Sequence, residues 1–291
     1  MSSTDTLTRP VVAPAAARTA RKRRRHPWVT GVVLSVGALA TAFPFTWMIV
    51  SAVKPRPESM AYPPHLLPQQ LTLQYFTQLV RQLDFGRYLL NTLAVVLISM
   101  VGLLLMAMAG YGFAKFTFRG KEPIFFLVLT TMMIPVQVTM IPTYLILNGL
   151  GLTNTLVGIA LPTLVSAFGV FLFRQFMTTI PTEVLEAARI DGAGEGRIFA
   201  RIVLPMSRPI LAVQVVLTFI TGWNSFLWPL VIASDQNLYT LSVGIALLNQ
   251  QVATNPSLQM AAASLMVVPV LVVFVVFQRH IVQGFALSGL K

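Results

Sequence analysis

YLLNTLAVVLISMVGLLLMAMAGYGFA, residues 88–114, is a run without Asp, Glu, Lys or Arg. A helix needs about 20 apolar residues to cross a bilayer, because each residue adds about 1.5 Å along the helix axis. The run is long enough to span a membrane as one helix. We therefore expect a helix over about 89–112.

Four further windows lack charged residues and are typical of additional membrane helices. They are 29–53, 123–173, 209–234 and 236–278. The second window is too long for one span, and it divides at the turn-rich stretch 148–154. The last window is apolar only from about residue 260 onward. We expect six spans, near 29–52, 89–112, 124–147, 155–176, 209–233 and 259–281.

The composition agrees with an all-α, polytopic membrane protein. Of the 291 residues, 55% are hydrophobic and 10% are charged, whereas soluble domains carry about 25% charged residues. Mean hydropathy is +0.74. These values exclude an ordinary soluble domain and a disordered chain. The absence of cysteine excludes disulfides, zinc–cysteine sites and a thiol nucleophile.

The net charge of +12 indicates membrane orientation rather than nucleic-acid binding. Seven of the 21 Lys and Arg residues precede residue 26, directly before an apolar run. With six spans, 17 of these cations fall on the side of the two termini and 4 on the other. Cytoplasmic loops carry the excess of Lys and Arg, so both termini are expected in the cytoplasm. A cleaved signal peptide is disfavoured because the first apolar run is too long.

Two loops are expected on the outer side. The first, 54–87, contains five prolines. Apolar residues within it recur at helical spacing and predict a short amphipathic helix that packs against the bundle. These residues are Leu73, Phe76, Leu79, Val80 and Leu83. The second outer loop, about 234–258, is polar and has Asp235 as its one charged residue.

The spans lack the residues that proton pumps and intramembrane enzymes use. No expected span has Asp, Glu, Lys or Arg near its middle, and the three histidines lie in loops or at span ends. The sequence has no HExxH motif, no Ser/His/Asp set in a span and no GxxxxGK[ST] loop. We therefore expect no catalytic residue, no metal site and no cofactor in this chain, which is not an enzyme. Prolines within the spans suit a kinked bundle around a polar path.

One long charged segment lies on the cytoplasmic side: PTEVLEAARIDGAGEGRIFARIVLPMSRP, residues 181–209. We expect a first helix capped by Thr182 and ended by Gly192, and a second over about 195–203 that stops before Pro205. Lipid-surface helices are usually rich in Lys and Arg. The acids and alanines of the first helix instead favour docking into a protein groove.

The same segment carries a spaced motif. Glu186-Ala187-Ala188 is followed after three residues by Gly192 and after nine more by Ile202-Val203-Leu204-Pro205. This spacing resembles the EAA loop of the membrane subunits of bacterial ABC importers. The resemblance implies that the loop docks into a cleft on a separate ATPase subunit. The residues implied in this coupling are Glu183, Glu186, Ala187, Ala188, Asp191, Gly192, Ile202, Leu204 and Pro205.

The resemblance extends from about residue 28 to the end of the sequence. Over this range the chain is similar to the MalG subfamily of carbohydrate-uptake permeases. This resemblance implies the type I ABC importer fold, with a permease domain over 28–283. The basic tail over 1–27 precedes this domain, and its cations are the reason to expect it in the cytoplasm. In that domain 54–87 is the outer loop and 177–208 the coupling loop, before a cytoplasmic tail over 284–291. Ser288 and Gly289 match only part of the family's glycine-rich ending, which contacts the ATPase pair. The other matching stretches are 109–120, 134–144, 149–155, 171–176 and 223–230.

The resemblance also implies partners and a location. These are a second, MalF-like permease, two ATPase subunits that hold ATP and Mg, and an extracytoplasmic solute-binding protein. The chain would then lie in the cytoplasmic (inner) membrane of a prokaryote, surrounded by lipid and without nucleic acid.

Amides, hydroxyls and aromatic faces in the spans suit a sugar or oligosaccharide. The candidate path residues are Asn91, Gln137, Thr139, Trp223, Asn224, Ser225 and Trp228. Such residues are also common at packing interfaces in membranes. Two alternatives stay open at this point: import of a polyol-type solute such as glycerol 3-phosphate, and a secondary transporter that acts alone.

Overall fold

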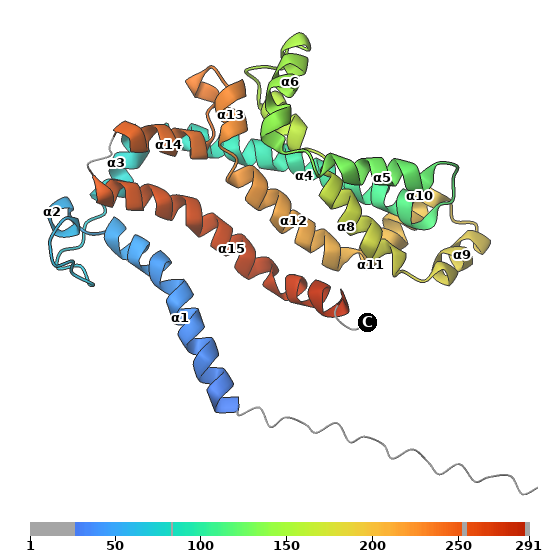
Figure 1. Ribbon diagram of the computed structural model, residues 1–291, viewed down its shortest axis with the longest axis horizontal. Helices are drawn as coiled ribbons and strands as arrows, with labels where there is room; N and C mark the ends of the chain where they lie inside the picture. Colours follow the sequence, from blue (N-terminus) through green and yellow to red (C-terminus); the bar gives the residue numbers. More distant parts are fainter. Residues whose placement is uncertain (1–26, 83, 252–254, 289–291) are drawn as a thin grey trace, which may run out of the picture. The chain divides into compact units, whose positions relative to one another are not determined.

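The computed structural model describes residues 27–82, 84–251 and 255–288, and within these ranges the chain is helical, without a β-strand (Figure 1). The chain divides into two compact units, Met1–Pro44 and Phe45–Lys291. The described part of the first unit is the beginning of helix α1 (Pro27–Ala52). Apart from the length and composition of α1, all further observations concern the second unit.

Three helices in the described ranges are long and apolar enough to cross a membrane. They are α1, α4 (Phe85–Lys115) and α15 (Pro256–Ser288). Up to three more spans result if each bent helix pair counts as one span. The expected number of six is therefore an upper bound, reached only if all three bent pairs are spans; the third pair is Glu195–Met206 with Arg208–Trp223, bent by 79°.

Two expected spans are wrong as continuous helices. In place of 124–147, α5 (Lys121–Thr131) and α6 (Val136–Gly149) meet at 101°. Pro135 precedes α6 and cannot donate a backbone hydrogen bond, so the first helix ends before it. In place of 155–176, the chain bends by 46° between the pair α7 (Leu156–Ala160) and η1 (Leu161–Thr163) and the next helix, α8 (Ala167–Thr178).

The expected span 209–233 is also wrong as one helix. Helix α12 (Arg208–Trp223) ends at Trp223, and a separate α13 (Leu227–Ile232) follows. The Asn224 side chain donates to the backbone oxygen of Ile220 at 3.0 Å, which is the kind of local bond that ends helices.

Helices α4 and α8 approach closely because glycine faces the partner helix at three positions. A Cβ on Gly102 would lie 1.5 Å from the Leu164 carbonyl oxygen, just before α8, and one on Gly110 would lie 2.4 Å from the Phe173 Cβ. From the other side, a Cβ on Gly169 would lie 2.2 Å from the Met106 sulfur. Small residues let membrane helices pack backbone to backbone.

The short helix expected in the outer loop is confirmed as α3 (Gln74–Gln82), which follows the single turn α2 (Arg56–Ser59). Its Tyr75 and Leu79 are buried in one apolar cluster with residues of α4, α12 and α15, as expected for packing against the bundle. Leu83, the last residue of the expected pattern, lies outside the described residues.

The stretch 234–258 contains a helix that the sequence analysis missed. Following the short η3 (Gln236–Leu238), α14 (Leu241–Gln251) buries Leu241, Ile245 and Leu248 in the same cluster as α3. These three residues recur at helical spacing. That periodicity could have revealed the helix behind the polar residues around it.

The glycine contact between α4 and α8 gives a first prediction. We expect Gly102→Ala to lower the melting temperature of the detergent-solubilised protein, because the new Cβ would overlap a backbone carbonyl that has no side-chain freedom to move away. Overpacking costs about 1–3 kcal/mol, which corresponds to a fall of about 2 °C or more for a chain of this size. The control is Gly112→Ala on the same helix, where a Cβ meets nothing within 4 Å. Equal melting temperatures for the two variants would contradict the packing described here.

Candidate functional site

The segment with the spaced motif folds as a helix, a turn and a second helical stretch. It contains α9 (Thr182–Ile190), α10 (Glu195–Ile198), the π-helical η2 (Phe199–Val203) and α11 (Leu204–Met206). Two expected boundaries are wrong. The residue before α9 is Pro181, so Thr182 is the first helical residue rather than the cap. The second helix passes Pro205, which lies in the first turn of α11, where a missing N–H is tolerated.

Gly192 ends α9 as expected. Its φ of +78° lies in the left-handed region. The Gly192 N–H donates to the Arg189 oxygen at 3.0 Å, and the Ala193 N–H donates to the Ala188 oxygen at 2.9 Å. These two bonds form the Schellman motif, which fixes the direction in which the chain leaves a helix.

Helix α9 is attached to the body of the protein on one side. Leu185 is 0% exposed, and it is the buried residue of this helix. It packs in an apolar cluster that also holds Tyr111 and Met106 of α4, and Phe173 and Met177 of α8. The packing of α4 and α8 therefore continues without interruption into α9.

The opposite side of α9 is open. Ile190 is 87% exposed, although an isoleucine is normally among the most buried residues. Glu183, Glu186 and Ala187 are exposed beside it, and so is Asp191 at the end of the helix. An apolar side chain among acids on an open helix face is typical of a docking surface for another protein.

The two alanines of the motif do not share one environment. Ala187 is exposed, whereas Ala188 is half-buried and packs against the apolar cluster below α9. Farther along the motif, Ile202 and Leu204 are half-buried against the same cluster, and Pro205 is half-buried as well. The second half of the motif thus contacts the body of this chain.

A polar link ties the segment to α4. Arg189 pairs with Glu195 at 2.7 Å across the turn, and the Tyr111 hydroxyl donates to the other Glu195 oxygen at 2.9 Å. The hydrogen bond from Arg189 lowers the pKa of Glu195, so this carboxylate stays ionised at neutral pH. Sequence reasoning missed Glu195, Tyr111 and Leu185, since their roles depend on contacts between separate helices.

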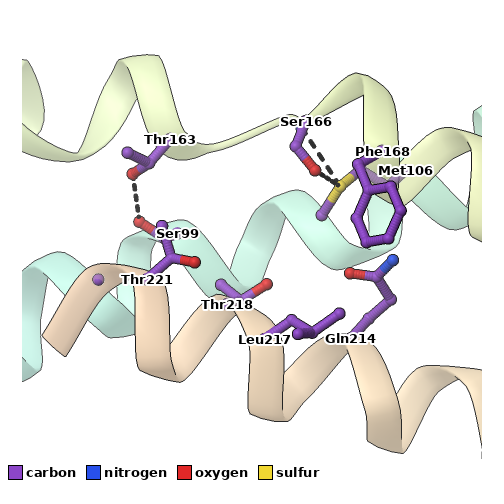
Figure 2. A pocket seen from close by; sticks show the side chains of 10 residues that line it. Ser99, Met106, Thr163, Ser166, Phe168, Gln214, Leu217, Thr218 and Thr221 are labelled. Atoms are coloured by element: carbon purple, nitrogen blue, oxygen red, sulfur yellow. Dashed lines mark hydrogen bonds between the residues drawn. The ribbon is translucent and has the colours of Figure 1, made fainter. Parts of the chain in front are cut away.

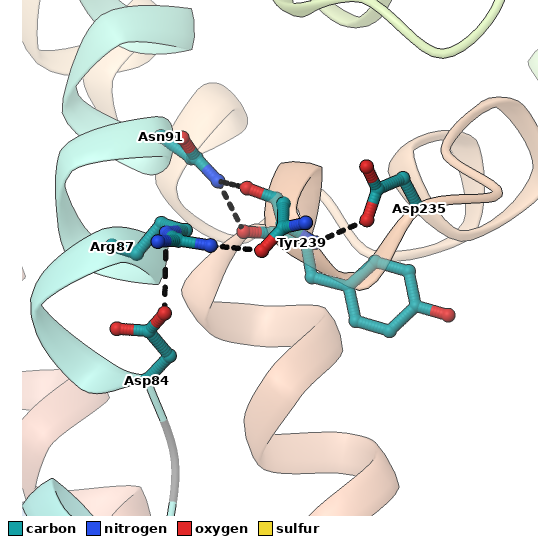
Figure 3. Close-up of polar contacts among 6 residues, drawn as sticks. Asp84, Arg87, Asn91, Asp235 and Tyr239 are labelled. Atoms are coloured by element: carbon teal, nitrogen blue, oxygen red, sulfur yellow. Dashed lines mark hydrogen bonds and ion pairs between the residues drawn. The ribbon is translucent and has the colours of Figure 1, made fainter.

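Several candidate path residues hold the fold together. Trp223 is buried, and its Nε1 donates to the Met266 oxygen at 2.9 Å. Trp228 Nε1 donates to the Ile159 oxygen at 3.1 Å. Asn91 donates from Nδ2 to the oxygens of Asn237 and Tyr239, at 2.7 and 3.0 Å (Figure 3).

Figure 3 shows that the Asn91 bonds belong to a polar network at the beginning of α4. Arg87 pairs with Asp84 at 3.1 Å and also donates to the side chain of Asn237. Asp235 in turn accepts the Asn237 N–H at 2.9 Å. The network fastens η3 to α4, which explains why Asn91 is buried.

Three of the remaining candidate path residues have exposed side chains. Gln137 and Thr139 are exposed on α6, and Asn224 is exposed after α12. The Ser225 backbone oxygen accepts from the Ser242 hydroxyl. The expected tail contact involves Ser288 and Gly289. Ser288 is the last residue of α15, and its side chain is not described. Gly289 lies outside the described residues, as do residues 1–26.

A cavity of about 260 Å³ lies between α4, α12 and the break before α8, and none of the seven candidate path residues lines it (Figure 2). Its walls carry five hydroxyls and one amide, and none of its lining residues is charged. These residues are Ser99, Met106, Thr163, Ser166, Phe168, Gln214, Leu217, Thr218, Thr221 and Gly222. Within the described residues, Gln214 Nε2 and Ser207 Oγ are the buried side-chain polar atoms without a hydrogen-bond partner.

Comparison with known proteins connects this geometry to a family. The model of the family described as "Binding-protein-dependent transport system inner membrane component" matches residues 102–286. The arabinooligosaccharides transport system permease protein AraQ of Halalkalibacterium halodurans is 33% identical over 280 residues, covering 93% of this chain and 99% of the relative. The sn-glycerol-3-phosphate transport system permease protein UgpE of Pectobacterium atrosepticum is 37% identical over 262 residues, covering 87% and 93%.

Two solved structures have the same fold. A chain of a bacterial ABC transporter involved in the import of the acidic polysaccharide alginate superposes with a TM-score of 0.77, at 24% identity over 90% of this chain and 98% of that chain. A chain of the MetNI methionine ABC transporter superposes with a TM-score of 0.54, at 17% identity over 74% of this chain and 99% of that chain. At these identities the likeness shows the fold alone, and it confirms the expected ABC importer fold.

The attachment of α9 by Leu185 gives a second prediction. Leu185→Ala would remove the buried contact of this helix at a cost of about 2–5 kcal/mol. We expect trypsin to cleave the segment about tenfold faster or more in solubilised protein, because cleavage follows the population of the opened segment when opening is fast. Arg189 and Arg197 are the cleavage sites to monitor by mass spectrometry. The control is Ile190→Ala at an exposed position, which should leave the cleavage rate within about twofold of the wild type. Similar cleavage rates in the two variants would show that Leu185 does not hold α9.

Proposed function

This chain belongs to the family of binding-protein-dependent transport system inner membrane components, and from that membership we propose that it is a permease subunit of an ATP-driven importer for a sugar or oligosaccharide. It forms one half of the path across the cytoplasmic membrane. A second, MalF-like permease forms the other half.

The open face of α9 is the observation that carries this proposal. Ile190 and Ala187 offer apolar contacts, and Glu183 and Glu186 surround them with acids that can pair with cations of a partner. A cleft on a separate ATPase subunit is the partner that fits this helix. The two ATPase subunits of the complex bind ATP and Mg, and an extracytoplasmic solute-binding protein delivers the solute.

Coupling follows from how α9 is attached. A force on the helix reaches α4 and α8 through Leu185 and its cluster, and it reaches α4 a second time through Glu195 and Tyr111. Interfaces of this kind pass motion on as shifts of whole helices, since packed side chains do not deform continuously. Closure of the ATPase pair would thus move the spans that enclose the path.

The proposed topology places six spans in the membrane, with both termini and the coupling segment in the cytoplasm. The excess of Lys and Arg on that side supports it. In this topology the C-terminal residues Ser288 and Gly289 are on the correct side to contact the ATPase pair. Gln137, Thr139 and Asn224, with exposed side chains, stay candidates for contact with the solute or the second permease.

A second candidate solute is glycerol 3-phosphate. The permease UgpE, named for sn-glycerol-3-phosphate transport, is as similar to this chain as the permease AraQ, named for arabinooligosaccharides. A transporter that acts alone is the weaker alternative, since the family is that of a multi-component system.

The turn at Gly192 gives a third prediction. Gly192→Val would force a β-branched residue into the left-handed region at a cost of about 1–2 kcal/mol or more, and it would change the direction of α9. In proteoliposomes holding the complete complex, we expect at least a tenfold loss of solute uptake, with the protein still in the membrane and still hydrolysing ATP. The readouts are uptake and solute-stimulated ATPase activity.

The matched control is Gly194→Val, which makes the same substitution two residues away. Gly194 has an ordinary φ of −70°, and a Cβ there meets nothing within 4 Å. It should keep nearly normal uptake. If Gly192→Val instead left both uptake and stimulated ATPase activity unchanged, the role of this turn in coupling would be refuted.

A further inference from the structure

A cavity with uncharged polar walls lies between α4, α12 and the break before α8 (Figure 2). Its volume of about 260 Å³ far exceeds the roughly 10–15 Å³ that one buried water needs. It therefore has room for a small ligand or for a group of waters.

One wall of the cavity is formed by the non-helical backbone between two helices. Residues 164–166 separate η1 from α8, and the helix resumes at Ala167, where the Ser166 hydroxyl accepts the Gly169 N–H at 3.0 Å. Non-helical backbone at membrane depth is tolerated where it is buried in protein or lines a cavity. The position of this break beside polar side chains of α12 is what a binding site within a span requires.

Gln214 is the decisive residue. Its side chain on α12 is 2% exposed, lines the cavity, and has an Nε2 atom without a partner. Nearly all buried polar groups in proteins are hydrogen-bonded, so an unpaired one points to a bound group. An amide also both donates and accepts, as a hydroxyl does.

The other walls indicate the chemical class of the ligand. Ser99 and Thr163, bonded to each other at 2.9 Å, provide hydroxyls on one side, and Thr218 and Thr221 provide hydroxyls on another. The ring of Phe168 provides an apolar face. No lining residue is charged, so a phosphate would enter without a cation to offset its lost hydration, which is costly.

We propose that this cavity binds one uncharged, hydroxyl-rich unit of the solute during passage, with Gln214 as its hydrogen-bonding anchor. This inference rests on the proposed function and adds to it a site and a preference for neutral sugars over glycerol 3-phosphate. Ser99 and Thr218 complete the polar contacts, and Phe168 packs against the C–H face of the sugar.

The test uses proteoliposomes with the complete transporter, its binding protein outside and ATP inside. The probes are radiolabelled arabinotriose and sn-glycerol 3-phosphate. We expect Gln214→Leu to lower arabinotriose uptake about three- to tenfold, as for the loss of one hydrogen bond to an uncharged group. The ATPase rate stimulated by the binding protein should stay unchanged. The melting temperature should stay the same or rise, because the variant removes an unpaired buried amide.

Gln175→Leu provides the control, since it makes the same substitution at an exposed position of α8. It should leave uptake unchanged. Thr218→Val, which exchanges a hydroxyl for a methyl group at constant shape, should lower uptake in the same direction as Gln214→Leu.

Each other outcome overturns a defined part of the account. Unchanged uptake by Gln214→Leu would show that the cavity holds only water. A loss of uptake together with a lower melting temperature and lower stimulated ATPase activity would assign Gln214 a structural role instead. Wild-type uptake of glycerol 3-phosphate without arabinotriose would refute the neutral class. Uptake of neither probe by the wild type, nor of other neutral oligosaccharides bound by its binding protein, would refute the proposed sugar or polyol import itself.

Discussion

The close approach of α4 and α8 is the constraint on which the rest of the structure depends. At Gly102 and Gly110 of α4 and at Gly169 of α8, there is no space for even one methyl group. In a membrane, apolar side chains gain nothing by leaving lipid for protein, so packing and satisfied polar groups must hold helices together. The glycines allow the two helices to make such contact over a long stretch. The elements packed on either helix are therefore built on one closely packed pair.

Residues 181–209, which we propose couple the spans to an ATPase subunit, are attached to this closely packed pair. This segment is connected to the pair by a buried leucine, by half-buried residues of its second half and by the hydrogen bonds of Glu195. Its open face carries an almost fully exposed isoleucine. Helix α9 is thus packed against the body of the protein on one side and exposed on the other. That asymmetry is what a part that transmits force between two proteins needs. At the other end of α4, the network around Arg87 and Asn91 holds η3 in a similar way.

The sequence predicted the features that depend on local chemistry. Apolar length located α1, α4 and α15, helical periodicity located α3, and the positive φ of Gly192 agrees with its expected place after α9. The breaks near Pro135 and before Ala167 were missed, since a proline in a membrane helix can bend it or end it, and only the neighbouring helices decide. Trp223 and Trp228, predicted as path residues, each donate the indole N–H to a backbone carbonyl of another helix, a structural role that the sequence alone does not show. Gln214 escaped notice because a lone glutamine in an apolar run shows its importance only through the cavity it faces.

The central claim is that α9 docks on an ATPase subunit, and crosslinking tests it most directly because the chain has no cysteine of its own. Ile190→Cys, labelled with a thiol-reactive photocrosslinker in native membranes, should yield one major adduct that mass spectrometry identifies as an ATPase subunit. Leu67→Cys, exposed to 76% in the loop expected on the outer side, should yield no such adduct. An ATPase adduct from position 67 but not from position 190, or none from either in an active complex, would contradict the account.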